Sequence, residues 1–466
     1  MIPWRSRAVS WRRNSAAAAL AALLLSACAT GLREEGPGGI GAVLFGKLPM
    51  TPVLSLQPGA QGSMALAWDV HPGAIYVRKL SPQGSRQWTW TLDEGAPEGR
   101  ERDFPKLSRA GGGWYVAWMS NSSAGRAWEV QLLSENGEPR WPEAAKVADI
   151  ASEGSELQAC TASDGSLVLA WTDVDKSTNS RFIGVADILD TGLVAWRREL
   201  GRALANGWYS APVLAPDESG GVFLAYRQIG PVADRGVMLQ HYSIDGDPVW
   251  PDGLDIYDVG GYKTPAAMAP DGAGGVILFW EDGREASMKI YAQRVSPEEG
   301  PLWRSEGIAV AYSPGNQWSP LVAPDGLGGA YAAWLDDNRG GFSQLKLQHL
   351  GSEGKPSLGP AGLVAAPTQE RQFKPVMIQD GSNGAFLGWL ENGHGQYQLL
   401  AQHFDLYGTR DWDEAGAALV DTPALKEGLQ IVADGEGGLV FAWRSLSSGS
   451  WDVRAARLDG ASKRVW

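Results

Sequence analysis

The sequence is poor in cysteine, in histidine and in charge. Its 466 residues include two cysteines and five histidines, and only 20% are charged. Only Cys160 lies in the body of the chain, so no internal disulfide can form there, and in the alternating stretch ELQACTAS we interpret it as a small buried residue. The net charge is −13. This argues against nucleic acid as a partner, because nucleic-acid binding needs a basic surface.

Motifs of familiar enzyme chemistry are also missing. The sequence has no HExxH, no nucleophile elbow, no phosphate loop, no sialidase-type Asp box and no pair of adjacent cysteines. Three histidines recur in one repeated phrase (LQHYS, LQHLG, AQHFD), which indicates a structural role; they are His241, His349 and His403. We therefore expect no catalytic residues, no cofactor and no enzymatic activity, with a hydrolase or lyase as a remote alternative.

The longest apolar run, residues 16–25, is too short to span a bilayer as a helix. It follows an arginine-rich start and precedes Leu-Ser-Ala-Cys, which ends at Cys28. This arrangement resembles a bacterial lipobox. The resemblance implies a signal peptide over 1–27, palmitate-type lipidation of Cys28 and a tether over 28–35. Because Ala29 is not aspartate, it also implies the outer membrane, on the periplasmic side or at the cell surface. The alternative is an ordinary signal peptide with an incidental cysteine.

Glycine and tryptophan are abundant, with 60 and 22 residues, which favours an all-β, turn-rich fold. A phrase of the type APDGxGGxxxAW recurs eight times, in strong or weak form, at spacings of 50 to 55 residues. The aromatic residues that end these phrases are Trp68, Trp118, Trp171, Tyr226, Trp280, Trp334, Trp389 and Trp443.

A second marker follows each phrase by about 23 residues, in a glycine turn, and keeps the same phase. Within a repeat the apolar residues alternate, and turns divide the repeat into four short strands. Four antiparallel strands per repeat of this length predict a β-propeller blade. A β-helix would have a shorter period, and separate sandwiches would need longer units. We predict one eight-bladed β-propeller over 36–466.

The eighth repeat reaches its second marker at Trp466 and is followed by no fourth strand. The segment GIGAV near the N-terminus aligns with GIAVA, the fourth strand of another repeat. We therefore predict that residues 38–46 supply the outer strand of blade eight and so close the ring, which removes exposed strand edges.

The glycine turn with its tryptophan resembles the docking motif of propellers related to pyrroloquinoline-quinone dehydrogenases. The resemblance implies an indole between neighbouring blades whose N–H meets a backbone acceptor. Lipobox, blade number and turn are also similar to the eight-bladed lipoprotein of the outer-membrane β-barrel assembly machinery, although the blades here are longer. The predicted interblade residues are Trp88, Trp141, Trp196, Trp250, Trp303, Trp412 and Trp466. In the sixth repeat Leu358 takes the place of the tryptophan.

Two sets of residues are candidates for binding. An aromatic residue stands shortly before the proline of five inner strands and could ring the channel mouth, where it would suit a sugar, a peptide or an apolar side chain. These candidates are Phe104, Tyr209, Tyr262, Trp318 and Phe373. The alternative is that each packs beneath its own crossover. Asp173 and Asp175 form a weak candidate metal site, because the loop lacks the glycine and glutamate of a calcium loop. Asp282/Arg284 and Asp336/Arg339 are interpreted as surface ion pairs.

Together these features predict a lipid-anchored envelope propeller that acts as a non-enzymatic protein-binding or scaffolding module. The alternative is a lipoprotein that binds carbohydrate or another surface polymer. The expected partner is an envelope protein or a polysaccharide, the membrane is contacted through the lipid alone, and the propeller is expected to be a monomer.

Overall fold

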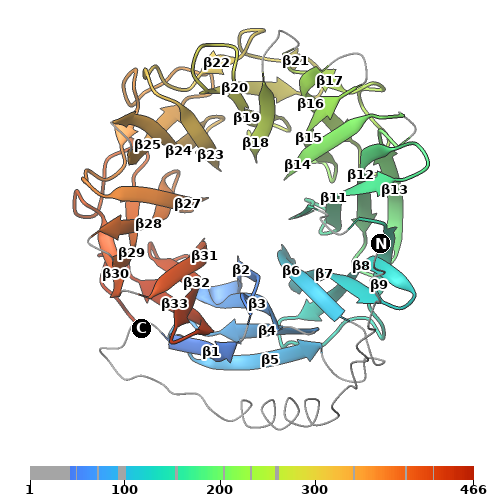
Figure 1. Cartoon of the computed structure of the whole chain (residues 1–466), viewed down its shortest axis with the longest axis horizontal. Coiled ribbons are helices and arrows are strands. Elements are labelled where there is room, and N and C mark those ends of the chain that lie inside the picture. The colour runs from blue at the N-terminus through green and yellow to red at the C-terminus, as the bar shows by residue number, and fades with distance from the viewer. Residues whose placement is uncertain are drawn as a thin grey trace, which may run out of the picture.

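The chain forms a ring of radial sheets around an open channel (Figure 1). The structure is a computed structural model, and it describes residues 42–48, 50–70, 73–92, 101–152, 156–202, 205–230, 234–257, 262–339, 342–393, 396–422 and 424–466. The predicted signal peptide 1–27, the lipidation site Cys28 and the tether 28–35 lie outside the described residues. Within the described part, no helix is both long and apolar enough to cross a membrane.

The strands fall into four concentric groups. The inner strands are β2 (Leu54–Pro58), β6 (Glu101–Ala110), β10 (Leu157–Thr161), β14 (Trp208–Pro216), β18 (Lys263–Pro270), β23 (Gln317–Pro324), β27 (Arg371–Gln379) and β31 (Leu425–Ala433). The second strands are β3 (Met64–Val70), β7 (Gly113–Ser122), β11 (Leu167–Asp175), β15 (Val222–Ile229), β19 (Val276–Asp282), β24 (Ala330–Arg339), β28 (Ala385–Gly393) and β32 (Leu439–Ser447).

The third strands are β4 (Ala74–Leu80), β8 (Gly125–Ser134), β12 (Ser180–Ile188), β16 (Asp234–Tyr242), β20 (Lys289–Ser296), β25 (Phe342–Leu350), β29 (Gln396–Phe404) and β33 (Ser450–Leu458). The outer strands are β5 (Arg86–Leu92), β9 (Ala145–Ile150), β13 (Val194–Leu200), β17 (Leu254–Asp255), β21 (Gly300–Pro301) with β22 (Ile308–Ala309), β26 (Leu363–Val364), β30 (Ala417–Thr422) and β1 (Ala42–Leu48). One short 3-10 turn, η1 (Ala60–Gly62), lies between β2 and β3.

The strand pairing confirms the eight-bladed propeller. Six blades are separate antiparallel sheets, and the third and fourth blades are joined into one sheet by a single parallel bridge between Arg181 and Trp208. In each blade the second strand is almost wholly buried, because sheets cover both of its faces. The tryptophans of the first repeated phrase are therefore core residues; Trp68, Trp280, Trp334, Trp389 and Trp443 each have an exposed fraction of 0%.

The predicted ring closure is also confirmed. β1 pairs antiparallel with β33, with Ala42 opposite Ala455 and Leu48 opposite Trp451, so β1 is the outer strand of blade 8. Its bounds are 42–48 where we predicted 38–46, and residues 38–41 lie outside the described part. Leu44 and Leu48 are buried in a core cluster that also contains strands of blades 1 and 8.

The second tryptophan series lies between blades, as the resemblance implied. In six positions the indole N–H donates to a backbone carbonyl of the next blade, at 2.8 to 3.1 Å. In five of these positions the ring also covers a glycine of the turn that it contacts. At Gly137, for example, φ is +82° and a Cβ would lie 2.6 Å from the Trp88 ring, so this position needs glycine for its conformation and for its space. Trp466 makes the same contact across the closure, donating to Pro82 O at 2.9 Å.

Leu358 occupies the one position of this series without an indole, and Tyr331 supplies the missing donor. The Tyr331 hydroxyl donates to Leu406 O at 2.6 Å, and Leu406 stands two residues before Gly408, against which Leu358 packs. In the other blades the indole N–H contacts the carbonyl at this same place of the turn. A buried carbonyl is thus satisfied from a different strand.

We expect Tyr331→Phe to lower the free energy of unfolding by about 1 to 2 kcal/mol, because it leaves this carbonyl without its hydroxyl donor. Adding Leu358→Trp to that variant should recover most of the loss, since the indole N–H then has a free acceptor. Denaturant unfolding of the single and double variants measures both effects. Equal stability of Tyr331→Phe and the wild type would contradict this account.

Candidate functional site

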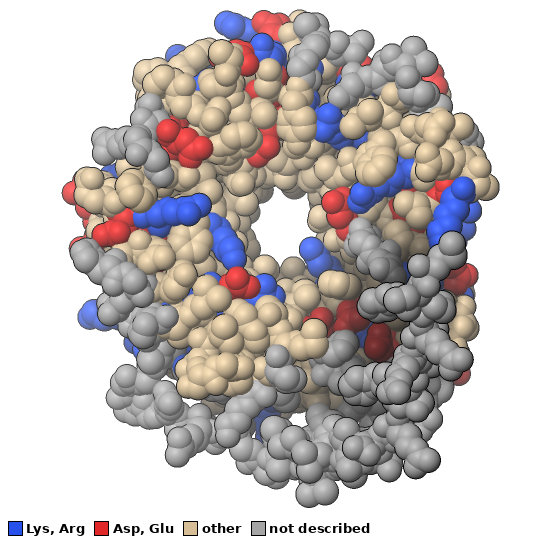
Figure 2. All heavy atoms as spheres, in the orientation of Figure 1, with Lys and Arg blue, Asp and Glu red and all other residues tan. Residues whose placement is uncertain are grey.

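The mouth of the channel is formed where the inner strands begin, and most of these strands begin with a β-bulge. In several blades the residue directly before the proline has a left-handed conformation, although it is not glycine. These residues are Phe104 (φ 59°), Ala211 (52°), Ser319 (53°) and Lys374 (49°). Such conformations cost about 1 to 3 kcal/mol each, and strained backbone of this kind is concentrated at functional sites. Figure 2 shows the open channel with charges of both signs near it.

The structure distributes the five aromatic candidates unevenly around this mouth. Phe104 and Tyr262 are about half exposed, with exposed fractions of 48% and 47%. Trp318 is half-buried and donates its N–H to Asp337 at 2.9 Å. Tyr209 is buried and stacks on Tyr226, so this ring lies inside blade 4 and not at the mouth surface.

Phe373 is half-buried. It packs against a core cluster between blades 7 and 8, with its edge toward Tyr397. The alternative of packing beneath the crossover therefore describes Tyr209 and Phe373. Phe104 and Tyr262 are the candidates whose rings remain available at the mouth.

In four blades the residue that follows the first aromatic series is charged, and some of these side chains contact the next blade at the channel mouth. Asp69 on β3 accepts hydrogen bonds from the N–H groups of Val53 (2.6 Å) and Phe104 (3.3 Å). Glu281 on β19 accepts one from the N–H of Ser319 at 2.8 Å, in the corresponding place. Both carboxylates thus hold a strained bulge residue of the neighbouring blade.

The guanidinium groups at the same place act differently. The Arg227 guanidinium lies 4.4 Å from the Tyr262 ring centroid, and Arg444 donates to Glu427 at 3.1 Å. The channel mouth therefore carries fixed charges of both signs.

Two titratable groups on the strands of blades 1 and 2, Asp69 and Lys106, have displaced pKa values. Asp69 has an exposed fraction of 8%, and burial raises its pKa; the neighbouring charge of Asp103 raises it further. Lys106, on the same strand as Asp103, has its pKa lowered by burial. The exposed ring of Phe104 lies between these two residues in the sequence. Neighbouring groups with displaced pKa values are typical of acid–base sites.

The recurrent histidines belong to a structural network. The aspartate that opens a glycine turn accepts N–H groups of that turn and contacts a histidine or arginine side chain on the third strand of its own blade. His241 lies 2.7 Å from Asp217, and its ring stacks on Phe223 at 4.3 Å. The corresponding pairs are His349–Asp325, His403–Asp380, Arg294–Asp271 and Arg457–Asp434. These pairs hold the turns in place.

The weak metal candidates are engaged by the protein itself. Asp173 accepts from the N–H groups of Ala151 and Ser152, and Asp175 contacts Ser177 and Arg202. Among the described residues, no group of three or more histidine, cysteine, aspartate or glutamate side chains could hold a metal ion.

The interpretation of Asp282 and Arg284 as a surface pair needs correction. Asp282 has an exposed fraction of 0%, and its carboxylate lies 2.5 Å from the Arg284 guanidinium. Asp336 is equally buried and accepts from Ser313 at 2.6 Å. Both aspartates also accept from a core tryptophan, so they belong to the interior.

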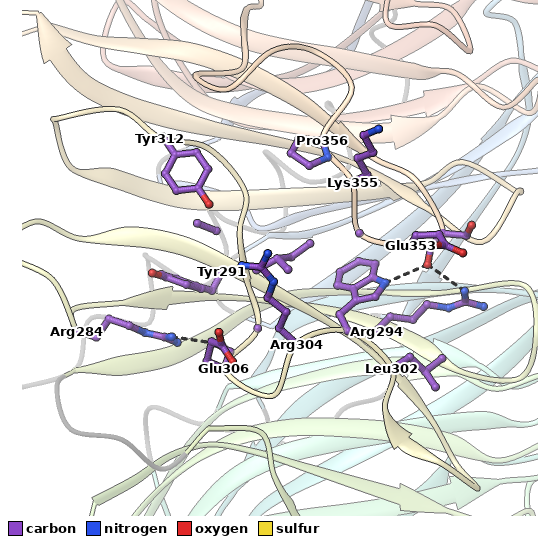
Figure 3. A pocket seen from close by; sticks show the side chains of 16 residues that line it. Arg284, Tyr291, Arg294, Leu302, Arg304, Glu306, Tyr312, Glu353, Lys355 and Pro356 are labelled. Atoms are coloured by element: carbon purple, nitrogen blue, oxygen red, sulfur yellow. Dashed lines mark hydrogen bonds between the residues drawn. The ribbon is translucent and has the colours of Figure 1, made fainter.

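A hollow lies at the outer edge of blade 5, where the outer strand is divided into β21 and β22, and it extends to the outer turn of blade 6 (Figure 3). Its volume is about 790 Å³, and we call it the rim groove. Arginine, lysine, glutamate and aromatic side chains line it, among them Arg284, Arg304, Glu306, Tyr312, Glu353 and Lys355. Its residues were not among the sequence-based candidates, because they come from turns that differ between repeats.

Comparison with solved structures gives three instructive likenesses. The chain is similar to a prolyl endopeptidase (TM-score 0.49, 13% identity, 86% of this chain and 55% of that one). It is also similar to the β-propeller domain of the Trilobed protease from Pyrococcus furiosus (0.45, 11%, 82% and 97%). A thermostable family-43 glycoside hydrolase matches less well (0.29, 14%, 55% and 93%).

The chain thus spans about half the length of the prolyl endopeptidase that it matches. Likenesses at this level of identity show the β-propeller fold alone. No protein-family model and no curated protein matches the sequence. The finer resemblance to quinoprotein-like propellers or to an assembly lipoprotein therefore gains no support beyond the propeller.

The prediction of a non-enzymatic protein-binding or scaffolding module is wrong. It is contradicted by these comparisons, because the similar structures include those of peptidases and glycoside hydrolases. It rested on the absence of short linear motifs, which says little about a site assembled from separate blades. The comparisons do not themselves give this chain an activity.

Proposed function

We propose that this chain is a hydrolase of glycosides that acts at the channel mouth between blades 1 and 2. The observation that carries the proposal is the neighbouring pair of carboxyl groups, Asp69 and Asp103, of which Asp69 has its pKa raised by burial and by Asp103. Glycoside hydrolysis commonly uses two carboxyl groups whose environments separate their pKa values. The exposed Phe104 beside them offers a flat surface against which a sugar ring can stack.

In this proposal Asp69 is the general acid and Asp103 the general base. Asp69 gives its proton to the glycosidic oxygen as the bond from that oxygen to the anomeric carbon breaks. Asp103 accepts a proton from the attacking water, whose oxygen forms the new bond to the anomeric carbon. The water is divided between the two products, and proton exchange with solvent restores both carboxyl groups.

Asp69 also has a structural task, since it accepts the N–H of the strained Phe104, and a test must separate the two roles. Asp69→Asn and Asp103→Asn should each lower kcat on a cleaved aryl glycoside by about 10²- to 10⁴-fold. Glu281→Gln is the matched control, because Glu281 holds Ser319 in the same way in blade 5. It should leave kcat within about twofold of wild type while losing comparable stability.

The pH dependence adds a second readout. Because the raised pKa keeps Asp69 protonated to higher pH than an ordinary aspartate, the rate should fall as pH rises through that pKa, and this fall should be absent in residual Asp69→Asn activity. A panel of aryl glycosides with different sugars would identify the substrate. Equal loss of activity in Glu281→Gln and Asp69→Asn would assign Asp69 a structural role and refute the proposal.

A further inference from the structure

Two exposed aromatic residues occupy the same place of the repeat on neighbouring blades. Trp208 on β14 lies opposite Ile229. The carbonyl of Tyr262, directly before β18, accepts the N–H of Gly283. Ile229 and Gly283 are each the third residue after the first-series aromatic of their blade. Trp208 and Tyr262 are therefore equivalent residues of blades 4 and 5, and their exposed fractions are 51% and 47%.

This pair departs from the rest of the repeat. The structure describes the equivalent position in four other blades, and none of these four has an aromatic residue there. The residues are Glu101, Asn316, Arg371 and Leu425. Blade packing is common to all of these blades, so it does not require two exposed rings in blades 4 and 5. Adjacent exposed rings of this kind indicate an interaction surface.

An arginine of the preceding blade covers one face of each ring. The Arg181 guanidinium lies 5.5 Å from the ring centroid of Trp208, and the Arg227 guanidinium lies 4.4 Å from that of Tyr262. A guanidinium stacks on the flat face of an aromatic ring. The exposure of each ring therefore falls mainly on its other face, which is left as a flat surface for a ligand.

The backbone that carries Trp208 is fixed as well. The N–H of Arg181 donates to Gly207 O at 2.9 Å, next to the parallel bridge between Arg181 and Trp208. The Arg181 guanidinium also donates to the Thr172 hydroxyl at 3.0 Å. A ring that is held in place before binding loses little conformational entropy when a ligand stacks on it, so more of the contact appears as affinity.

The polar edges of the two rings are free for hydrogen bonding. Neither the Trp208 indole N–H nor the Tyr262 hydroxyl has a hydrogen-bond partner among the residues that the structure describes. Each residue thus offers a flat apolar face with a donor at its edge. This combination suits a sugar unit, which presents C–H groups on the face of its ring and hydroxyl oxygens around its edge.

The spacing and the charge define the ligand that carries these sugar units. Sheets packed face to face lie about 10 Å apart, which is more than one sugar ring covers, so a ligand that meets both rings has at least two linked units. The net charge of −13 disfavours an acidic polymer. β18 lies across the channel from β2, so a ligand held at blades 4 and 5 reaches the proposed cleavage site only if it is a long chain (Figure 1).

We propose that Trp208 and Tyr262 bind two units of one uncharged polysaccharide chain, and that this chain is the substrate of the hydrolysis proposed at blades 1 and 2. The identification of the chain as a substrate rests on that proposed function, whereas its binding does not. Each ring stacks on one sugar unit, and the channel mouth separates the bound units from the glycosidic bond that is cleaved.

Native electrophoresis of the full chain in gels that contain hydroxyethylcellulose, arabinoxylan, galactomannan or amylopectin tests the binding. We expect at least one of these polymers to retard the wild type. Trp208→Ala and Tyr262→Ala should each raise the Kd for that polymer by about tenfold, and the double variant should lose the retardation. A tetrasaccharide of the same polymer should compete for the site better than its monosaccharide, because only the longer ligand meets both rings.

Tyr407→Ala is the matched control. Tyr407 has an exposed fraction of 78% and lies in the turn after the third strand of blade 7, away from the mouth, so this variant should migrate like wild type. Tyr262→Phe keeps the ring and should keep most of the retardation, which separates stacking from a general loss of structure.

Two results would overturn the proposal: no retardation by any of the four polymers, or equal retardation of the wild type and the double variant. Retardation without release of reducing ends from any glycoside would support the binding site and refute the hydrolysis. Cleavage of an aryl glycoside without retardation would do the reverse, so the two failures are distinguishable.

Discussion

Removing the closing strand should cost this propeller more stability than any single substitution in it. We expect deletion of residues 42–48 to lower the free energy of unfolding by on the order of 5 kcal/mol. The deletion exposes the edge of β33 and removes Leu44 and Leu48 from the core, at about 2 kcal/mol for each side chain. The backbone hydrogen bonds with β33 are lost as well.

The rest of the closure should keep the deletion variant folded. Trp466 and Arg457 of blade 8 still donate to Pro82 O of blade 1, both at 2.9 Å. Thermal and denaturant unfolding would measure the loss, and a synthetic peptide that contains residues 42–48 should restore part of the stability when added in excess. An unchanged unfolding midpoint would contradict the role of β1 in holding blades 8 and 1 together.

The second large effect concerns Asp187 on β12, where blade 3 departs from the charge pairing of its neighbours. Asp187 lies opposite Val168 in blade 3, and His241 lies opposite Phe223 at the equivalent place in blade 4. Asp187 therefore stands where the neighbouring blade has its histidine. The position of the partner aspartate holds Ala162. Asp187 is 3% exposed, and its Oδ1 has no hydrogen-bond partner. Burial raises its pKa to about 6, with the charge of Asp164 as a lesser cause.

This raised pKa predicts how stability depends on pH. The folded state binds the Asp187 proton more tightly than the unfolded state, so the contribution of this group is fully present below pH 4 and is lost as pH rises through about 6. A rise from 3.8 to about 6 corresponds to about 3 kcal/mol. Asp187→Asn should therefore be about 2 to 3 kcal/mol more stable than wild type at pH 7.5 and nearly equal to it at pH 4.

Urea unfolding of Asp187→Asn and of wild type at several pH values measures this difference in the free energy of unfolding. The titration of the other groups is common to both proteins, so it cancels in the difference. As a control, Ala162→Asp/Asp187→His rebuilds the pair of blade 4, in which Asp217 and His241 lie 2.7 Å apart. It should also be more stable than wild type at pH 7.5. A constant difference between Asp187→Asn and wild type from pH 4 to pH 8 would contradict the buried, unpaired carboxylate.

The sequence predicted the ring well because its signals are repeated. Eight copies of two markers fix the number of blades, and the copy without a fourth strand points to its replacement at the N-terminus. The tryptophan turns were predictable for the same reason, since an indole meets a turn glycine at five of the eight junctions. Only the bounds of β1 differ, because strand ends depend on the register with β33.

The site was much less predictable, because the proposed function depends on residues at which one blade departs from the repeat. Asp69 and Asp103 belong to different strands, and the bulge at the start of blade 2 brings the N–H of Phe104, the residue after Asp103, against Asp69 of blade 1. The rim groove is lined by turns of blades 5 and 6 that differ from one repeat to the next. Tyr209 satisfied the same sequence pattern as Phe104 but is buried, since a pattern of one aromatic before a proline does not specify which way the ring turns.

The release of reducing ends by wild type and Asp69→Asn, measured on one glycoside in H₂¹⁸O, tests the proposed function most directly. The account predicts that wild type releases sugar with ¹⁸O at the anomeric carbon, and that Asp69→Asn does so at least about 10²-fold more slowly while Glu281→Gln keeps its rate. Release by wild type no faster than by Asp69→Asn, across the full panel of glycosides, would contradict it.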